Sequence, residues 1–325
     1  MLAYIVRRLL YAIPILVGVN LITFALFFVV NSPDDMARMQ LGVKRVTPEA
    51  IQKWKAERGY DKPLFWNAQA EGVGKATQTI FYTKSVRMFA FDFGRADDGR
   101  DIAREIATRM NPSLAVAVPV FVLGLFATIS FALLLVYFRA TYLDVAGVVL
   151  CVAMMSISGL FYIIGGQWLV SKVWHLVPIS GYSEGLTAGK FLILPVIIGV
   201  IGGIGSGTRW YRTIFLEEIG KDYVRTARAK GLSERLVLFR HVLRNALIPI
   251  LTGVVVVIPT LFMGSLLIES FFGIPGLGSY TIDAINAQDF AVVRSMVFIG
   301  SCLYIVGLML TDISYTLVDP RIRFQ

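Results

Sequence analysis

The sequence predicts an all-α, polytopic membrane protein with six transmembrane helices. The chain has 325 residues, of which 56% are hydrophobic and 16% charged, whereas about a quarter of the residues in an ordinary globular domain are charged. Its mean hydropathy is +0.68. A helix needs about 20 apolar residues to cross a bilayer. Six charge-free runs are candidates: Leu9–Val30, Ser113–Phe138, Val145–Val170, Phe191–Gly207, Ala246–Leu267 and Met296–Thr311.

The first and last runs define how the chain enters and leaves the membrane. Leu9–Val30 is longer than the apolar core of a signal peptide, and no small-residue cleavage site follows it, so it is predicted to be an uncleaved span. The segment "NSPDDM" after it predicts a turn. The sixth run continues through "DISYTLV" to about Val318. Six spans place both termini on the same side.

Lys and Arg residues assign the two sides of the membrane. The segment from Arg209 to Arg244 alone holds nine of them, whereas Ser270–Val293 holds none. Cytoplasmic loops carry the excess of Lys and Arg, so both termini and the basic insert are predicted to be cytoplasmic. The same side also carries Arg7, Arg8, Arg139, Arg321 and Arg323, while the opposite loop carries only Lys172 and Lys190.

The long segment 31–112 is predicted to be a small extracytoplasmic insertion, because long translocated segments are largely exempt from the charge rule. Within it, Thr47 and Gly59 bracket a predicted helix, with Pro48 in its first turn. "REIATRMNPS" predicts another helix leading into the second span. The expected organisation is therefore 1–30, N-terminus and first span; 31–112, insertion; 113–318, membrane core including a loop at 208–245; and 319–325, cytoplasmic tail.

Few residues offer chemistry inside the spans. The two cysteines are expected to be buried apolar residues rather than metal ligands, and His175 and His241 fall outside the spans. No metal site or catalytic residue is predicted, and no RNA-binding or zinc-finger pattern indicates nucleic acid. Asp312 is either a relay carboxylate or an acid partnered at a helix end. Glu269 carries the same two interpretations, with an outer gate as a third.

Gly199, Gly203 and Gly207 recur every four residues along the fourth run. This spacing places them on one helix face, where the missing side chains allow another helix to approach closely. The alternative is the higher glycine content that is general in membrane helices. The first interpretation predicts a packing face between spans.

The basic insert "KDYVRTARAKGLSERLVLFRHVLRNALIPI" spans Lys221–Ile250. A helix is predicted over Lys221–Lys230, with Gly231 ending it and Ser233 capping a second helix. From spacing alone, two interpretations stay open. The insert is either a bent helical element held at the cytoplasmic face or an amphipathic helix resting on anionic lipid.

The insert resembles the cytoplasmic loop of ABC-importer permeases, in the branch that imports dipeptides, oligopeptides and nickel. The general pattern of that loop, E-A-A with Gly three residues later, would lie over Arg225–Ala227 and Gly231, where only Ala227 and Gly231 match; "RTARAKG" is usual in the peptide branch. Pro249 closes the pattern later than usual. Further resemblances lie in "YIVRRLLYAIPIL", "LVPISGY", "SLLIESFFGIPGLG" and "LVDPRIRF", and "DISYTLVDPRI" is similar to the Yej-type oligopeptide (microcin C-type) permease.

This resemblance implies the type I ABC-importer permease fold and a set of partners. They are a homologous second permease, two ABC ATPase subunits that carry ATP and Mg²⁺, a periplasmic or lipid-anchored substrate-binding protein, and membrane lipid. The chain itself lacks G-x-x-x-x-G-K-[ST], the phosphate-binding loop of such ATPases. The implied ATPase-coupling residues are Tyr223, Arg225, Thr226, Ala227, Arg228, Lys230, Gly231 and Ser233, and the implied outer gate comprises Glu269, Pro275, Gly276 and Gly278.

The sequence departs from the resemblance in one span, and it leaves alternative functions open. "SISGLF" at Ser156–Phe161 lacks the proline common in the family, which affects the expected bend of the third span. The same architecture importing nickel or another small solute is an alternative. A stand-alone channel or carrier is another, although a carrier would show paired intramembrane charges or repeated halves. A membrane enzyme would need a nucleophile–base pair that the spans lack.

Overall fold

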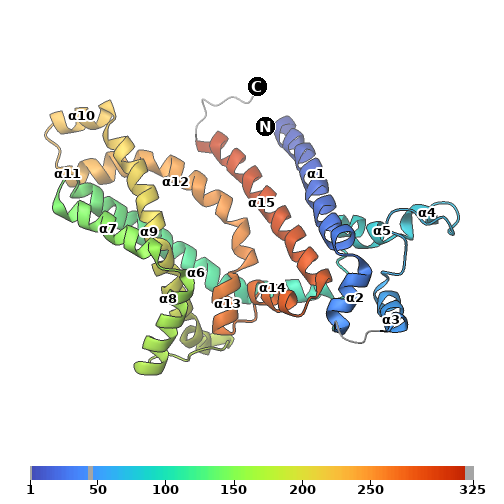
Figure 1. The fold of residues 1–325 in the computed structure, drawn as a ribbon. Coiled ribbons are helices and arrows are strands. Elements are labelled where there is room, and N and C mark those ends of the chain that lie inside the picture. The colour runs from blue at the N-terminus through green and yellow to red at the C-terminus, as the bar shows by residue number, and fades with distance from the viewer. Residues whose placement is uncertain (1, 43–46, 319–325) are drawn as a thin grey trace. The chain divides into compact units, whose positions relative to one another are not determined.

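The computed structural model describes residues 2–42 and 47–318, and every regular element in these ranges is a helix (Figure 1). Their single bridge of β type joins Arg95 and Asp101. The predicted all-α fold is confirmed. The predicted tail 319–325 lies outside the described residues. Packing groups the chain into two compact units, residues 1–108 with 281–305 and residues 109–280 with 306–325.

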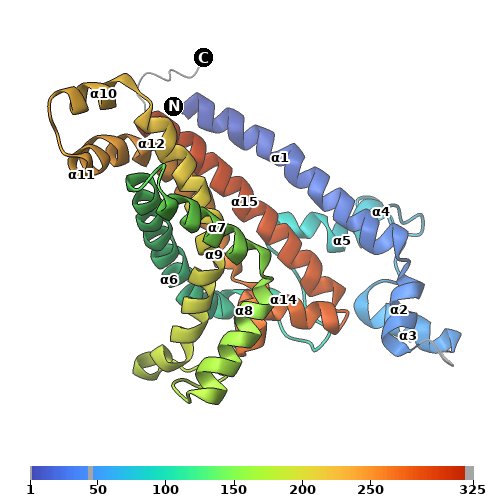
Figure 2. The ribbon, with the colours of Figure 1, turned by 60° about the vertical axis from the view of Figure 1, so that its left-hand side comes forward.

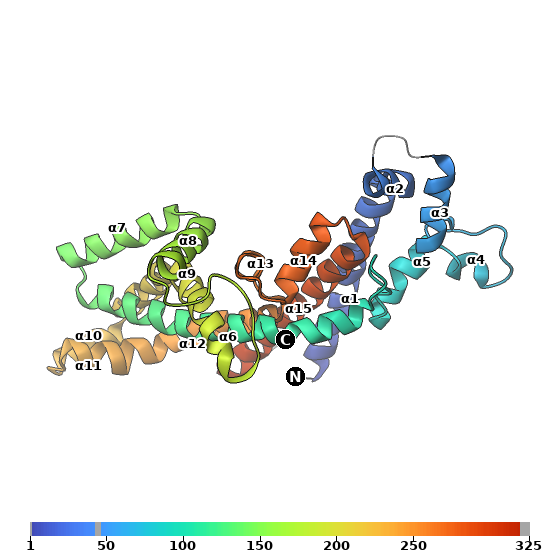
Figure 3. The same cartoon turned by 90° about the horizontal axis from the view of Figure 1, so that it is seen from below.

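The first unit combines the N-terminal span with the predicted insertion. The short helices α2 to α5 gather at the C-terminal end of α1 (Figure 3). Phe24 and Phe28 from the end of that span pack against Trp54 and Tyr60 of the insertion. The insertion therefore shares a core with the first span. The elements are α1 (Leu2–Phe24), the π-helical η1 (Ala25–Val30), α2 (Pro33–Leu41), α3 (Pro48–Arg58), α4 (Gly74–Thr77), α5 (Ile80–Lys84) and the 3-10 turn η2 (Val86–Ala90).

Helix α3 begins and ends at the residues that the sequence predicts. The Thr47 hydroxyl accepts a hydrogen bond from the Ala50 amide at 3.3 Å, and Gly59 ends the helix with φ 68°, a left-handed conformation that costs glycine little. This predicted helix is confirmed, as is the one over "REIATRMNPS", which forms the start of α6 (Ile102–Tyr137).

The predicted turn "NSPDDM" is a helix start instead. Ser32 and Asp35 form a capping box, in which each side chain accepts a hydrogen bond from the other's backbone amide. Hydrogen bonds that the Ser32 hydroxyl and then the Ser32 amide donate to the carboxylate lower the pKa of Asp35. The prediction of a turn was wrong because Ser-Pro-Asp-Asp satisfies the amides of a helical first turn.

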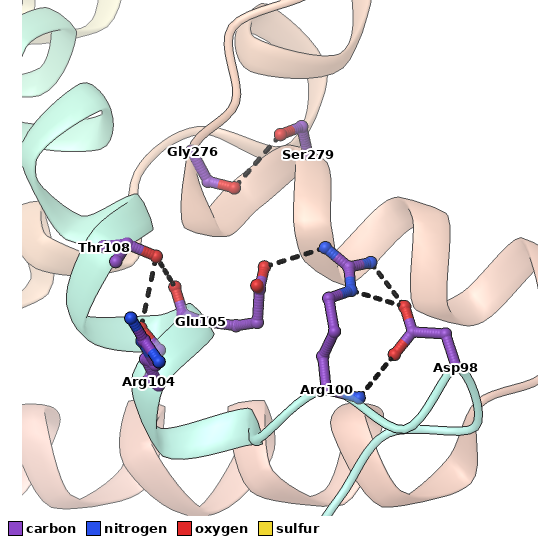
Figure 4. Close-up of polar contacts among 7 residues, drawn as sticks. All are labelled: Asp98, Arg100, Arg104, Glu105, Thr108, Gly276 and Ser279. Atoms are coloured by element: carbon purple, nitrogen blue, oxygen red, sulfur yellow. Dashed lines mark hydrogen bonds and ion pairs between the residues drawn. The ribbon is translucent and has the colours of Figure 1, made fainter.

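An ionic contact precedes α6 in the first unit. The Arg100 guanidinium donates to Asp98 and, at 3.1 Å, to Glu105 (Figure 4). Hydrogen bonding to Arg100 lowers the pKa of Asp98. The contact links the loop before α6 to its first turn.

The second unit contains most of the membrane helices. Both α7 and α8 contact α9, and α8 turns away from the direction of α7 (Figure 2). Besides most of α6, the elements are α7 (Tyr142–Ser156), α8 (Gly159–Gly166), η3 (Gln167–Val173), η4 (Gly185–Thr187), α9 (Ala188–Ile219), α10 (Asp222–Ala229), α11 (Glu234–Leu236), η5 (Val237–Val242), α12 (Leu243–Val257), η6 (Pro259–Met263), α13 (Leu266–Phe272), α14 (Leu277–Asn286) and α15 (Phe290–Val318). Three helices, α6, α14 and α15, extend across both groups of residues.

The described residues contain five helices long and apolar enough to span a membrane, and a sixth span if α7 and the helix from Gly159 to Val173 count as one. That pair bends by 86° at its break, so the third predicted run is not a straight helix. Ile157 has extended backbone, with ψ 127°. The bend therefore forms without the proline common in the family.

Two further spans differ from their predicted bounds. Helix α9 extends beyond Phe191–Gly207 at both ends, so the start of the 208–245 loop is helical. The fifth run is interrupted between η6 and α13 by Gly264, whose φ is 66°. Such a break could not be predicted from the charge-free run, because apolar composition is compatible with either a continuous or an interrupted helix.

Candidate functional site

The loop at residues 208–245, predicted to couple to the ATPases and called the coupling loop below, bends between α10 and α11 (Figures 1 and 2). Gly231 has φ 77° just after α10, which favours glycine at the bend. Ser233 occupies the N-cap position of α11, but its side chain makes no capping hydrogen bond. Its carbonyl instead accepts from the Val237 amide at 3.0 Å. The sequence therefore predicted the position of the bend. A backbone hydrogen bond, rather than the predicted side-chain cap, stabilises the start of α11.

One face of α10 is buried in its own chain. Val224 is fully buried and Ala227 is 3% exposed. Both belong to a hydrophobic cluster with the ends of α6 and α9 and with η5 and α12. Ala227 is thus small where α10 packs against the chain's own core. The buried members from the neighbouring elements are Ala132, Leu133, Val136, Phe215, Ile219, Val237, Leu238, Val242, Ala246 and Ile250.

The other face of α10 is polar and exposed. The Arg225 side chain is 75% exposed, and its contact with Asp222 is 3.5 Å long. Beside it lies a hollow of about 470 Å³ whose lining includes Thr226, Lys230 and His241. The residues of the predicted coupling set with exposed positions are Arg225, Thr226, Lys230, Gly231 and Ser233.

Arg228 serves the loop itself. Its guanidinium donates two hydrogen bonds to Glu234, at 3.1 and 2.8 Å, and Arg139 at the end of α6 donates to the same carboxylate at 3.0 Å. We call these three residues the Glu234 cluster. Charge-assisted, bidentate contacts of this kind fix geometry as well as energy. The cluster connects α10, α11 and α6.

A second carboxylate anchors the start of α10. Glu218, 7% exposed near the end of α9, accepts hydrogen bonds from Lys221 and from the Tyr223 hydroxyl. Desolvation, together with the hydrogen bond to Glu218, raises the pKa of Tyr223 to about 12. Tyr223 therefore connects α10 to α9 as well as lining the hollow.

The glycines of the fourth span face different neighbours. A Cβ atom at Gly199 would lie 2.8 Å from Val120, and one at Gly207 would lie 2.7 Å from Thr128, both on α6. A Cβ at Gly203 would meet no atom within 4 Å. The close approach to α6 thus uses two of the three predicted glycines. Gly205, which the four-residue spacing omitted, lies against α7, since a Cβ there would be 2.6 Å from the Cys151 carbonyl.

Glu269 organises the turn after α13. The residue is fully buried, and its carboxylate accepts hydrogen bonds from the backbone amides of Ser265 at 3.1 Å, Gly278 at 2.7 Å and Ser279 at 3.1 Å. Ser113 of α6 also bonds the carboxylate and accepts from the Leu277 amide at 2.7 Å. The site is a buried acid saturated by backbone donors.

The remaining members of the predicted outer gate shape the same turn. A Cβ at Gly276 would overlap the Glu269 carboxylate, and one at Gly278 would lie 2.6 Å from the Ser265 carbonyl. The Ser279 hydroxyl donates to the Gly276 carbonyl at 3.0 Å (Figure 4). Pro275 is exposed. The two glycines therefore permit the turn to close around the carboxylate.

One buried pair of opposite charges joins two of the membrane helices just outside the predicted runs. Asp144 of α7 is 6% exposed and receives two hydrogen bonds from Arg212 of α9, at 2.9 and 2.7 Å. Both residues lie near helix ends, just outside the charge-free runs. The sequence search missed them because it tested only those runs. Within the described residues, no group of three or more His, Cys, Asp or Glu is arranged to hold a metal ion.

Comparisons with known proteins cover the whole chain. Residues 100–324 match the family described as binding-protein-dependent transport system inner membrane component, and residues 1–78 match its N-terminal membrane component. The chain is 32% identical to a Brucella abortus (strain 2308) protein named as a putative peptide transport system permease. It is 31% identical to the dipeptide transport system permease protein DppB of Escherichia coli K12. It is 27% identical to the oligopeptide transport system permease protein AppB of Bacillus subtilis (strain 168). Each alignment covers 100% of both chains. The chain therefore belongs to the binding-protein-dependent transport system inner membrane component family, the multi-pass permease subunits of ABC importers.

Proposed function

We propose that this chain forms one half of the translocation pathway of an ATP-driven peptide importer. A second permease would form the other half, two ABC ATPases would carry ATP and Mg²⁺, and a periplasmic or lipid-anchored binding protein would deliver peptide. The relatives' names support the substrate class. The observation that carries the coupling role is the division of α10 into a buried apolar face and an exposed face with Arg225 and Thr226.

The contacts of the coupling loop suggest how movement would pass into the membrane. The Glu234 cluster ties the loop to α6, and Glu218 ties it to α9. Closure of the ATPases would therefore move α10 and the ends of these helices as one lever. Such coupling requires two states with different contacts at each end. In this proposal Arg225 and Lys230 contact the ATPase, while Arg228 keeps the loop rigid.

The proposed orientation follows the distribution of Lys and Arg. The N-terminus, the coupling loop and the tail 319–325 would be cytoplasmic, and the insertion 31–112 would face outward. The membrane core 113–318 would carry the pathway, with its outer side closed by the turn around Glu269. Since that carboxylate is fully buried, it would support the gate by holding the turn rather than by touching peptide.

The finer substrate assignment is a proposal with an alternative. Similarity in "DISYTLVDPRI" supports a Yej-type permease for oligopeptides, including peptide-nucleotide antibiotics. The alternative is the same machine importing nickel or another small solute. The binding protein would decide between these substrates, because in this branch it holds most of the specificity.

Affinity purification of the tagged chain from its native membrane in mild detergent tests the proposal. We expect a second permease and ATPase subunits to co-purify. A variant with Arg225→Glu and Lys230→Glu should lose the ATPases and retain the second permease. Recovery of the chain alone, from cells shown to express the ATPases, would contradict the proposal and favour a stand-alone channel or carrier.

A further inference from the structure

A polar cavity of about 320 Å³ lies within the first unit, and it shares no lining residue with the coupling loop or the Glu269 turn. Its lining includes the charged residues Glu57, Arg58, Lys84, Arg95 and Asp97, together with Tyr60. Ligand cavities are typically about 300–1,000 Å³ and place a few polar groups where they orient the ligand. The size and the charged lining make this cavity suited to a small polar ligand.

Asp97 already forms hydrogen bonds with other residues of the first unit. It accepts hydrogen bonds from Arg58 at 2.8 Å and from Gln40. Its own amide donates to Asp289 at 2.7 Å. Asp289 in turn accepts from the Val292 amide at 3.2 Å. The two acids thus act chiefly in holding the cavity wall together.

Lys84 forms no ion pair among the described residues, and neither does Arg95. The Lys84 ammonium lies 5.1 Å from the centre of the Tyr60 ring. Behind it, the buried Arg294 donates to the Lys84 carbonyl at 3.2 Å and to the Phe290 carbonyl at 3.1 Å. Lys84 is partly buried, whereas Arg95 is exposed. A partly buried cation without an ion-pair partner is costly, so this arrangement favours an anion beside Lys84.

The charged groups that act on Lys84 are mainly positive, although two acids, Asp97 and the exposed Glu57, also line the cavity. The groups that act on it are Arg294 on α15, Lys62 after α3, Arg58 at the end of α3 and, with the opposite sign, Asp97. Burial and these cations lower the pKa of Lys84 to about 8. An anion would reverse both causes, because it would replace lost hydration and offset the neighbouring positive charge.

We propose that this cavity is a binding site for a small oxyanion, a carboxylate or a phosphate, held by Lys84 and Arg95. Carboxylate and phosphate share the acceptor geometry that ammonium and guanidinium groups recognise. Binding requires protonated Lys84, so affinity is highest below about pH 8 and falls as the pH rises through that value. The inference does not depend on the peptide substrate or on the ATPase partners.

Competitive acetylation of lysines in the full chain in nanodiscs, read by mass spectrometry between pH 6 and pH 11, tests the site. The neutral amine reacts, so the profile of Lys84 should have its midpoint near pH 8. Saturating inorganic phosphate or glutarate should raise that midpoint by about one unit, which corresponds to roughly tenfold tighter binding to the protonated form. The exposed Lys53 should not respond.

Variants separate a defined site from general attraction. Arg95→Met should weaken the affinity for the anion about tenfold, as read from the shift of the Lys84 midpoint. The substitution removes a charge-assisted partner worth on the order of 1.4 kcal/mol. Lys53→Met removes one positive charge from the same unit and should change nothing. A response to one anion alone identifies phosphate or carboxylate as the ligand. The proposal is overturned if neither anion shifts the Lys84 midpoint, or if Lys53→Met weakens the effect as much as Arg95→Met.

Discussion

Arg228 and Glu234 face each other across the bend of the coupling loop, where two hydrogen bonds of 3.1 and 2.8 Å join guanidinium to carboxylate. Arg139 shares the same carboxylate. The bend at Gly231 is therefore closed by charged groups on both of its arms. The loop is held as a single body by contacts within the chain, which is the property that transmission of movement needs.

Glu234→Gln should weaken this body while preserving its shape. The amide removes the charge that both arginines bind, and we expect a loss of about 1–2 kcal/mol of stability, since the side chains are about a third exposed. Uptake per ATP hydrolysed should fall several-fold in the reconstituted complex. Asp222→Asn is the matched control, because the Asp222–Arg225 contact is longer and its side chains are 95% and 75% exposed. Equal losses in the two variants would contradict the role of the Glu234 cluster.

Substitutions of Gly231 should separate backbone strain from steric obstruction. Gly231→Ala should cost about 1–2 kcal/mol, because L-residues are strained at positive φ, whereas Gly231→Asn should cost less. Gly231→Trp should leave membrane insertion intact but abolish ATP-driven uptake, because a Cβ there meets no atom of the chain within 4 Å and the ring would occupy the proposed docking surface. Membrane abundance and uptake are measured together. Normal uptake by the Trp variant would exclude the coupling assignment.

Local signals in the sequence predicted much of the framework. The caps of α3, the bend at Gly231 and the apolar runs each depend on residues close together in the chain. Asp144 and Arg212 were missed because they become neighbours only when α7 and α9 pack. Glu218 and Glu234 have partners within six residues in the chain, and they were missed because the search for paired charges covered only the apolar runs. The acid in "YLDVAG", between apolar residues, was the available signal for Asp144. The breaks at Ile157 and Gly264 were missed for a different reason, since hydropathy does not record backbone direction.

Glu269→Gln should destabilise the turn that follows α13. The carboxylate accepts from three backbone amides, and an amide side chain would present donors to donors. We expect a loss of about 2–3 kcal/mol, which is the scale of buried hydrogen bonds to a charged group. Thermal unfolding and limited proteolysis between residues 264 and 279 provide the measurement. Asp283→Asn, at an exposed position of α14, should have neither effect; unchanged proteolysis in Glu269→Gln would show that the carboxylate does not hold the turn.

Labelling should establish the proposed orientation. In a variant with both native cysteines replaced by Ser, Lys53→Cys should react with a membrane-impermeant maleimide in intact spheroplasts, because both position 53 and its insertion would face outward. Arg225→Cys should react only after the membrane is opened, although its side chain is 75% exposed. The expected asymmetry follows from the cytoplasmic excess of Lys and Arg. Reaction at both positions before opening would contradict the assigned sides.

Tyr223→Phe should change the alkaline stability of the coupling loop. The folded-state pKa of Tyr223 is raised to about 12, whereas an unperturbed Tyr titrates near 10. Its contribution is therefore fully present below about pH 10 and is lost as the pH rises through about 12, because the unfolded chain loses its proton first. The free energy of unfolding of the wild type should thus fall more steeply over this interval than that of Tyr223→Phe.

The difference between the two proteins is the informative quantity, since other tyrosines and lysines titrate in both. At neutral pH Tyr223→Phe should also lose about 1 kcal/mol, because Glu218 keeps Lys221 but loses the hydroxyl donor. Chemical unfolding at pH 8, 10 and 11.5, with Tyr142→Phe as an exposed control, measures both effects. Parallel slopes for wild type and Tyr223→Phe would show that the Glu218 contact does not retain the phenolic proton. The link between α9 and α10 would then depend on packing by Val224 and Ala227.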